Sequence, residues 1–246
     1  MSIIQGTVHS SSGPWSGFDS NEILTLNGTS NFLSRTVTTA GSTQKMTFSA
    51  WVKFVTISAA GDHTLFGQGD GTDDTMLVRQ GAGTWWLIER NTYTYYKRST
   101  AGPVAGTLYH IVMSIDYTQT LDTNRVKIFV DNVNITGPTG TGNTYPPANH
   151  TFYALNKTDS GINTFVIGRN PYGSSGYCHV ELSDVHYIDG FVYSPSDFAQ
   201  TVDSVYQPKT DFSGITNYGT NGFYLKFTNS SNIGDDSAGS NDLTLT

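Results

Sequence analysis

The chain has 246 residues, and only 13% of them are Asp, Glu, Lys or Arg, about half of the usual share in a soluble domain. Its 13 basic and 20 acidic residues give a formal net charge of −7. The chain therefore lacks the excess of positive charge that binding to nucleic-acid phosphates requires. Aromatic residues reach 13%, which is too many for a disordered polar segment, so we expect one domain with a sizeable core.

Targeting and membrane signals are missing from the sequence. The first residues, Met1 to Thr7, have neither a basic start nor an apolar stretch, so we expect no signal peptide. Every apolar run is far shorter than the roughly 20 residues that cross a bilayer, so we expect no membrane insertion. The single cysteine, Cys178, has no partner for an internal disulfide. These features are typical of a protein made in a reducing cytoplasm.

Alternation of apolar and polar residues predicts strands along most of the chain. In residues 46–55, apolar side chains from Met46 to Phe54 share one face, whereas Trp51 lies on the other. The dipeptide Asp131-Asn132 predicts a tight hairpin, because both residue types tolerate positive φ. The same alternation predicts five further strands, over residues 108–116, 125–131, 165–168, 178–188 and 223–227.

The sequence offers little helix. One short turn is predicted after Pro195, with Ser196 as the N-cap and residues 197–200 as the helix. Gly-rich and Pro-rich stretches predict long loops over residues 67–75 and 137–151. Many short strands with almost no helix predict an all-β fold of two antiparallel sheets packed face to face.

We expect a single domain over residues 1–246. Residues 1–20 are predicted to form an N-terminal arm, and residues 205–246 to return to the sandwich as a C-terminal segment.

Five segments in this order resemble the concanavalin A-like, laminin-G-type jelly roll. The resemblance implies a two-sheet jelly-roll β-sandwich in which these segments are central strands. The segments are Leu24–Leu33, Phe48–Lys53, Tyr109–Val112, Val126–Asp131 and Glu181–Asp189.

The C-terminal third resembles virion proteins of tailed bacteriophages. The similar segments are residues 184–190, 206–209, 218–227 and 235–242. This resemblance implies a non-enzymatic structural protein, made in the host bacterium and displayed on the virion surface as a head decoration or as a fibre or adhesion subunit. The implied partners are other virion proteins and further copies of the chain in a homo-oligomer. The sequence has neither a heptad repeat nor a collagen-like run, which favours a decoration or small adhesion subunit over a fibre shaft.

Glycoside hydrolysis is the least favoured alternative. Glucanases of this architecture carry Glu-x-Asp-x-x-Glu on one strand, so that alternate carboxylates share a face. Here Glu181 and Asp184 are three residues apart, and in a regular strand they point to opposite faces. Only a bulge would bring them together. We therefore expect that the chain is not an enzyme.

An aromatic and basic segment predicts a recognition surface for glycan or for a partner protein. It contains Trp85, Trp86, Tyr93, Tyr95 and Tyr96. Adjacent tryptophans on a strand point to opposite faces, so one belongs in the core while the other can stack on a sugar or a partner chain. Tyr93 and Tyr95 share a face for the same reason. Three interpretations stay open: core packing, contact within a particle, and binding of host surface polysaccharide.

Calcium is the only cofactor that the sequence raises. Asp70, Asp73 and Asp74 lie in one Gly-containing loop, and Ca²⁺ prefers such carboxylate and carbonyl oxygens. Proteins of the laminin-G type often bind calcium at a rim of the sandwich. The favoured alternative is an Asx turn in contact with solvent.

Overall fold

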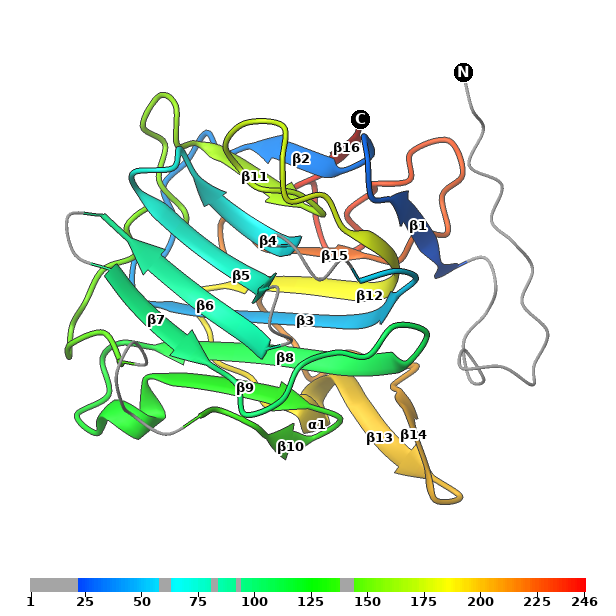
Figure 1. Ribbon diagram of the computed structural model, residues 1–246. Coiled ribbons are helices and arrows are strands. Elements are labelled where there is room, and N and C mark those ends of the chain that lie inside the picture. Colours follow the sequence, from blue (N-terminus) through cyan, green and yellow to red (C-terminus); the bar gives the residue numbers. More distant parts are fainter. Residues whose placement is uncertain (1–21, 58–62, 81–83, 92–93, 138–143) are drawn as a thin grey trace.

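The computed structural model describes residues 22–57, 63–80, 84–91, 94–137 and 144–246. These residues form two large antiparallel sheets that face each other, with one short α-helix and the 3-10 helix η2 (Asp122–Asn124) (Figure 1). The predicted all-β sandwich is confirmed. Within the described ranges, no helix has the length and apolar character needed to cross a membrane.

One layer, sheet A, contains seven described strands, with the long β12 and β3 near its centre. β15 pairs with β12 beyond the stretch that pairs with β1. The order is β1 (Leu24–Asn27), β12 (His179–Asp189), β3 (Lys45–Phe54), β8 (Leu108–Asp116), β9 (Val126–Val130) and β10 (Val133–Asn134), with β15 (Phe223–Leu225) beside β12.

The other layer, sheet B, also contains seven described strands. Its β4 to β7 form an antiparallel series of neighbours in chain order, visible in front of sheet A in Figure 1. The order is β16 (Thr244–Leu245), β2 (Leu33–Thr36), β11 (Thr164–Ile167), β4 (His63–Gly69), β5 (Asp74–Gln80), β6 (Thr84–Arg90) and β7 (Thr94–Arg98).

The six predicted strands are confirmed as β3, β8, β9, β11, β12 and β15. The predicted hairpin is confirmed as well. Asp131 and Asn132 join β9 to β10 with φ of 49° and 67°. Positive φ at both central positions is the type I′ geometry that fits the twist of two paired strands.

Two local predictions are wrong. Residues 67–75 are mostly strand, because Gly67 and Gly69 take places in the ladder between β4 and β5 instead of ending it. The helix α1 (Pro195–Phe198) begins two residues earlier than predicted, with Ser194 as its N-cap. Pro195 fits the first helical position, where no N–H is needed, and the Ser194 N–H donates to Asp197 Oδ2 over 2.7 Å.

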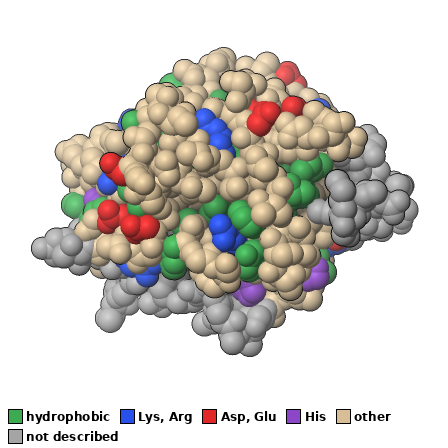
Figure 2. Space-filling model, turned by 90° about the horizontal axis from the view of Figure 1, so that it is seen from above, with side chains coloured by type: hydrophobic (Ala, Val, Ile, Leu, Met, Phe, Trp, Pro, Cys, Tyr) green, Lys and Arg blue, Asp and Glu red, His purple; other side chains and the backbone are tan. Residues whose placement is uncertain are grey.

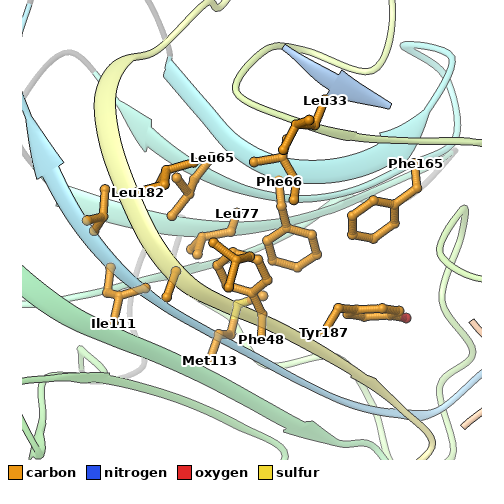
Figure 3. Close-up of a cluster of buried hydrophobic side chains, with 14 of the residues drawn as sticks. Leu33, Phe48, Leu65, Phe66, Leu77, Ile111, Met113, Phe165, Leu182 and Tyr187 are labelled. Atoms are coloured by element: carbon orange, nitrogen blue, oxygen red, sulfur yellow. The ribbon is translucent and has the colours of Figure 1, made fainter. Parts of the chain in front are cut away.

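The core lies between the sheets. The apolar face of β3 predicted from residues 46–54 is completely buried. Figure 3 shows Phe48 of β3, Phe66 of β4, Phe165 of β11 and Tyr187 of β12 meeting at its centre. The rings of Phe48 and Phe66 stack with centroids 4.2 Å apart. These interlocking rings fix how the two sheets face each other.

Residues 190–222, here called the cover segment, pack on the outer face of sheet A. They include α1 and the hairpin of β13 (Ala199–Val202) and β14 (Val205–Pro208), which projects from the body in Figure 1. Trp51, predicted to lie on this face, is only 4% exposed because Ala199 and Tyr206 pack against it. The outer face of sheet A is therefore a second apolar layer.

Two buried histidines join this layer to the cover segment. His110 Nδ1 lies 2.8 Å from the Tyr206 hydroxyl, and His186 Nδ1 lies 2.8 Å from the Tyr218 hydroxyl. The His110 ring stacks on Trp51 at 4.8 Å. Burial lowers the pKa of His110 to about 3 and the pKa of His186 well below its ordinary value. Both rings are therefore neutral at pH 7.

A row of buried polar side chains in sheet B holds a segment that is not part of either sheet. Gln68, Thr75 and Glu89 are direct neighbours across β4, β5 and β6. Their oxygens accept the backbone N–H groups of residues 153–156. Residues 153–156 are thus hydrogen-bonded although they have no strand partner, as buried backbone requires.

The surface agrees with the low charge of the sequence. In the view of Figure 2, acidic and basic side chains form small separate groups on a surface made mostly of uncharged polar side chains and backbone. When a ligand or partner docks on such a surface, few charged side chains lose their hydration, so the desolvation cost is small.

Candidate functional site

A cross-strand pair joins the candidate calcium loop to the aromatic and basic segment, which are separate in the sequence. Asp74 opens β5 and Arg90 ends β6, directly opposite each other. Arg90 Nε donates to Asp74 Oδ2 over 2.6 Å, and Nη2 contacts the same oxygen. The Asp74 side chain is completely buried, whereas the Arg90 side chain is 31% exposed. The carboxylate therefore holds the guanidinium in place at the surface.

Tyr172 completes this arrangement from a distant loop. Arg90 Nη2 donates to the Tyr172 hydroxyl over 2.9 Å, and the guanidinium carbon lies 5.4 Å from the ring centroid. The ring lies over Gly71, where an added Cβ would come within 3.2 Å of it. Gly71 also has φ of 94°, a conformation that favours glycine. Tyr172 remains partly exposed.

We call Tyr172, Arg90, Asp74 and Gly71 the Tyr172 site. It presents a partly exposed aromatic ring beside an oriented guanidinium. Sequence reasoning missed Tyr172, which is 82 residues from Arg90. Its local sequence, Asn170-Pro-Tyr-Gly, predicts only a turn, so nothing in the pattern marked the tyrosine.

The three candidate calcium ligands have different surroundings. Asp74 Oδ1 accepts the Gly71 N–H over 2.9 Å, so both oxygens of Asp74 already have partners. Asp70 Oδ1 accepts the N–H groups of Thr72 and Asp73, which is an Asx turn, the favoured alternative. Among the residues that the structure describes, no group of three or more His, Cys, Asp or Glu is arranged to hold a metal ion. Calcium binding stays a prediction.

Of the two adjacent tryptophans, the structure shows the burial of Trp85 only. Trp85 is 1% exposed and packs 5.6 Å from the ring of Phe54. A side chain so deeply buried cannot contact a glycan, so Trp85 is a core residue and not a binding residue. Trp86 pairs with Val78 and Arg98 in the ladder, but its side chain lies outside the described part of the structure. Its surface role stays a prediction.

The predicted tyrosines are placed only in part. Tyr93 lies outside the described residues. In β7, Tyr95 pairs with Glu89 and Tyr96 pairs with Ile88, while the side chains of both tyrosines are outside the described structure. Glu89 is completely buried, so the backbone position of Tyr95 lies opposite a residue that faces the core. The expected contact of these tyrosines with a ligand stays a prediction.

The strand β12, which carries the carboxylates Glu181 and Asp184, is not regular. The register of β12 against β3 shifts between Ser183 and His186, and Asp184 has φ of 44°. The assumption of a regular strand is therefore wrong, because a β-bulge interrupts it.

Both of these carboxylates have protein partners. Glu181 forms an ion pair with Lys53 at 2.6 Å. Asp184 accepts the Tyr224 hydroxyl over 2.5 Å. Burial raises the pKa of Asp184 to about 6, against the lowering effect of that hydrogen bond. The pair is thus engaged in the packing of β12 against β3 and β15.

Cys178 is a core residue. It is completely buried, and its thiol lies 3.1 Å from the carbonyl oxygen of Thr64. Burial raises the pKa of the thiol well above its ordinary value. A thiol that stays protonated is a poor nucleophile and metal ligand.

Residues 27–190 match the model of the concanavalin A-like lectin/glucanases superfamily. The match contains the central strands of both sheets and all of the Tyr172 site. The chain belongs to this superfamily. The resemblance to the laminin-G-type jelly roll is confirmed. A search of curated proteins found no match to the chain.

One solved structure with a TM-score above 0.5 supports the fold of this superfamily member, and two others are similar at lower TM-scores. A Bacteroides ovatus protein whose proposed role is carbohydrate binding is 16% identical, with a TM-score of 0.57 over 91% of this chain and 58% of that one. Domain 4 of an extracellular arabinanase from Geobacillus stearothermophilus, solved with arabinotriose, is 21% identical, with a TM-score of 0.49 over 70% and 72% of the two chains. A pentraxin from Limulus polyphemus is 16% identical, with a TM-score of 0.45 over 67% and 74%.

Proposed function

We propose that the chain is a non-enzymatic glycan-binding module, displayed on the surface of a bacteriophage particle, that contacts sugar through the Tyr172 site. The observation that carries the proposal is the partly exposed Tyr172 ring held beside Arg90. Sugars present flat C–H faces that stack on aromatic rings, and hydroxyl groups that accept from guanidinium N–H donors. The Tyr172 site offers both on one surface.

The pre-ordering of the site supports this function. Asp74 fixes Arg90, Arg90 fixes the Tyr172 hydroxyl, and Gly71 lets the ring lie close to the backbone. A ligand that binds such a site does not have to order these side chains first, which favours affinity. The membership in a superfamily that includes lectins is consistent with sugar as the ligand.

A glycan array tests this proposal. The wild-type chain is expected to bind a defined set of oligosaccharides, and Tyr172→Ala is expected to weaken binding about tenfold, as the loss of one stacking ring and its fixed hydroxyl implies. Phe191→Ala is the matched control, because Phe191 is an aromatic residue of the cover segment, 40% exposed, outside the Tyr172 site.

Circular dichroism of the three proteins establishes that both variants are folded. An unchanged array profile for Tyr172→Ala contradicts the proposed contact. The absence of any binding by the wild-type chain contradicts the proposed function.

The particle location is proposed from the sequence of the C-terminal third, which resembles virion proteins. We expect the chain in purified particles of the phage that encodes it, and quantitative mass spectrometry measures its copy number. Hundreds of copies per particle are expected for a head decoration, and a handful for a tail adhesin. Absence from purified particles would contradict a virion role in either place.

A purely structural role in the particle is the second candidate. The β13–β14 hairpin projects from the body (Figure 1), and the paired residues at its tip, Val202 and Val205, are 42% and 49% exposed. Exposed apolar pairs of this kind suit contact with a neighbouring subunit. A chain with this role alone would associate with other copies or virion proteins and give no signal on the glycan array.

A further inference from the structure

The positive charge of Arg90 in the Tyr172 site is already balanced by a carboxylate of the protein. Arg90 is the cation of the site, and the buried Asp74 carboxylate lies 2.6 Å from its Nε atom. A guanidinium with a bound carboxylate gains little from a second anion, because the first has already neutralised its charge. Arg90 therefore acts toward a ligand as an oriented hydrogen-bond donor and not as an unpaired cation.

The turn beside the ring adds negative charge. Asp70 and Asp73 lie in the four residues between β4 and β5, next to Gly71, over which the Tyr172 ring lies. The N–H groups of Asp73 and Thr72 lower the pKa of Asp70, so this carboxylate stays ionised at neutral pH. The side-chain amide of Asn91, which carries no charge, contacts Asp73 Oδ1. Neither contact cancels a negative charge.

Summed over the Tyr172 site and the turn beside it, these four charged side chains have an excess of two negative charges. Arg90 and Asp74 cancel, while Asp70 and Asp73 remain. An anionic group that approaches the ring is repelled by this excess, and because Asp70 is exposed, dissolved salt screens the repulsion. The net charge of −7 over the whole chain acts in the same direction.

The remaining polar groups of the site suit uncharged hydroxyls. Arg90 uses Nε and Nη2 for its protein contacts, and Nη1 has no hydrogen-bond partner within the described structure. The Tyr172 hydroxyl accepts from Arg90, so its own proton can be donated outward. Two donors beside a ring match the hydroxyl oxygens that border the apolar face of a neutral sugar.

We infer that the Tyr172 site selects neutral glycans and rejects glycans that carry carboxylate, sulfate or phosphate groups. This inference rests on the proposed glycan-binding function and adds the charge class of the ligand. The expected ligands are hexose and N-acetylhexosamine chains of a bacterial surface. Chains that contain uronate or sialate are expected to be rejected.

Matched oligosaccharide pairs test the inference. Lactose is compared with sialyllactose, and galactotriose with trigalacturonate, together with an array of further neutral and carboxylated chains. For every backbone that binds, the anionic member is expected to bind about tenfold more weakly at low ionic strength, and the difference is expected to shrink at 0.5 M salt because salt screens exposed charges.

Charge variants identify the source of the discrimination. In Asp70→Asn and Asp73→Asn the side chain keeps an oxygen that accepts the same hydrogen bonds but loses its charge. Each is expected to raise the affinity for the anionic member and to leave the affinity for the neutral member unchanged. Asp211→Asn is the matched control, because Asp211 also accepts a backbone N–H in an exposed turn, but lies in the cover segment on sheet A.

The outcomes separate the inference from the function on which it rests. Equal or tighter binding of the anionic member overturns the charge selection and leaves glycan binding in place. Discrimination that Asp70→Asn and Asp73→Asn do not reduce also overturns it. Failure of the wild-type chain to bind any glycan, neutral or anionic, overturns both.

Discussion

A decrease in pH from 7 to 4.5 is expected to remove about 2–3 kcal/mol of folding stability through His110 alone, given a pKa of about 3 in the folded chain and about 6.5 in the unfolded chain. The unfolded chain binds a proton below pH 6.5, whereas the folded chain cannot do so until about pH 3. The contribution is therefore fully present above pH 6.5 and is lost as the pH falls toward 3. His186 acts in the same direction, because burial lowers its pKa as well.

Buried carboxylates oppose this effect. The pKa of Asp184 is raised to about 6 by burial, and burial also raises the pKa of Glu89. Such groups favour the folded chain as the pH falls through their folded pKa values. The contribution of His110 must therefore be measured as a difference between two proteins with the same carboxylates.

Chemical denaturation of the wild type and of His110→Gln at several pH values makes this measurement. The variant is expected to be less stable at pH 7, because it loses the contacts to Ser49 and Tyr206, but its stability is expected to fall less steeply with acid. Asp184→Asn is the companion variant and is expected to show a steeper fall than the wild type. Parallel pH profiles for the wild type and His110→Gln would refute the assignment of a neutral buried histidine.

Replacement of Trp85 by alanine is expected to cost about 3–5 kcal/mol of folding stability, the range for truncation of a large aromatic side chain in a core. Trp85 is 1% exposed and contacts Phe54 in the layer between the sheets. Thermal and denaturant unfolding measure the loss. A reduction below 1 kcal/mol would be incompatible with the packing described for this residue.

Trp86→Ala is the matched control, since it removes the same side chain one position along the strand. If Trp86 has the predicted surface role, Trp86→Ala is expected to lower folding stability only slightly. It is also expected to weaken glycan binding if the binding surface extends along β6 from Arg90. Equal stability losses for the two variants would place both tryptophans in packed surroundings and remove Trp86 from the candidate surface.

The strands of the sandwich could be predicted because period two is a local property. Residues 46–54 alternate cleanly, and the strand, its buried face and the position of Trp51 on the other face all follow. The hairpin at Asp131 and Asn132 follows from residue types that tolerate positive φ. The prediction of a loop at Gly67 and Gly69 is wrong, because glycine favours turns but does not prevent pairing of its backbone in a sheet.

The Tyr172 site could be predicted only in part, because it depends on contacts between distant segments. The sequence indicated the Asp70–Asp74 loop and the aromatic segment around Arg90, but not that Asp74 and Arg90 are neighbours. Alternation showed that Trp85 and Trp86 differ without showing which is buried. The bulge at Asp184 shifts the apolar alternation of β12 from Val180 and Leu182 to Val185 and Tyr187, a change of phase that the prediction of one regular strand overlooks.

The central position of β12 has a consequence for how the chain folds. This strand pairs with β1, β3 and β15, and the residues it joins to β3 are more than 120 positions away in the chain, as in the pair of Val180 with Phe54. Closing so large a loop costs chain entropy before any contact compensates for it. During synthesis, β3 leaves the ribosome long before β12, so the edge of β3 that later pairs with β12 stays without its partner, whereas β8 can pair with the other edge earlier.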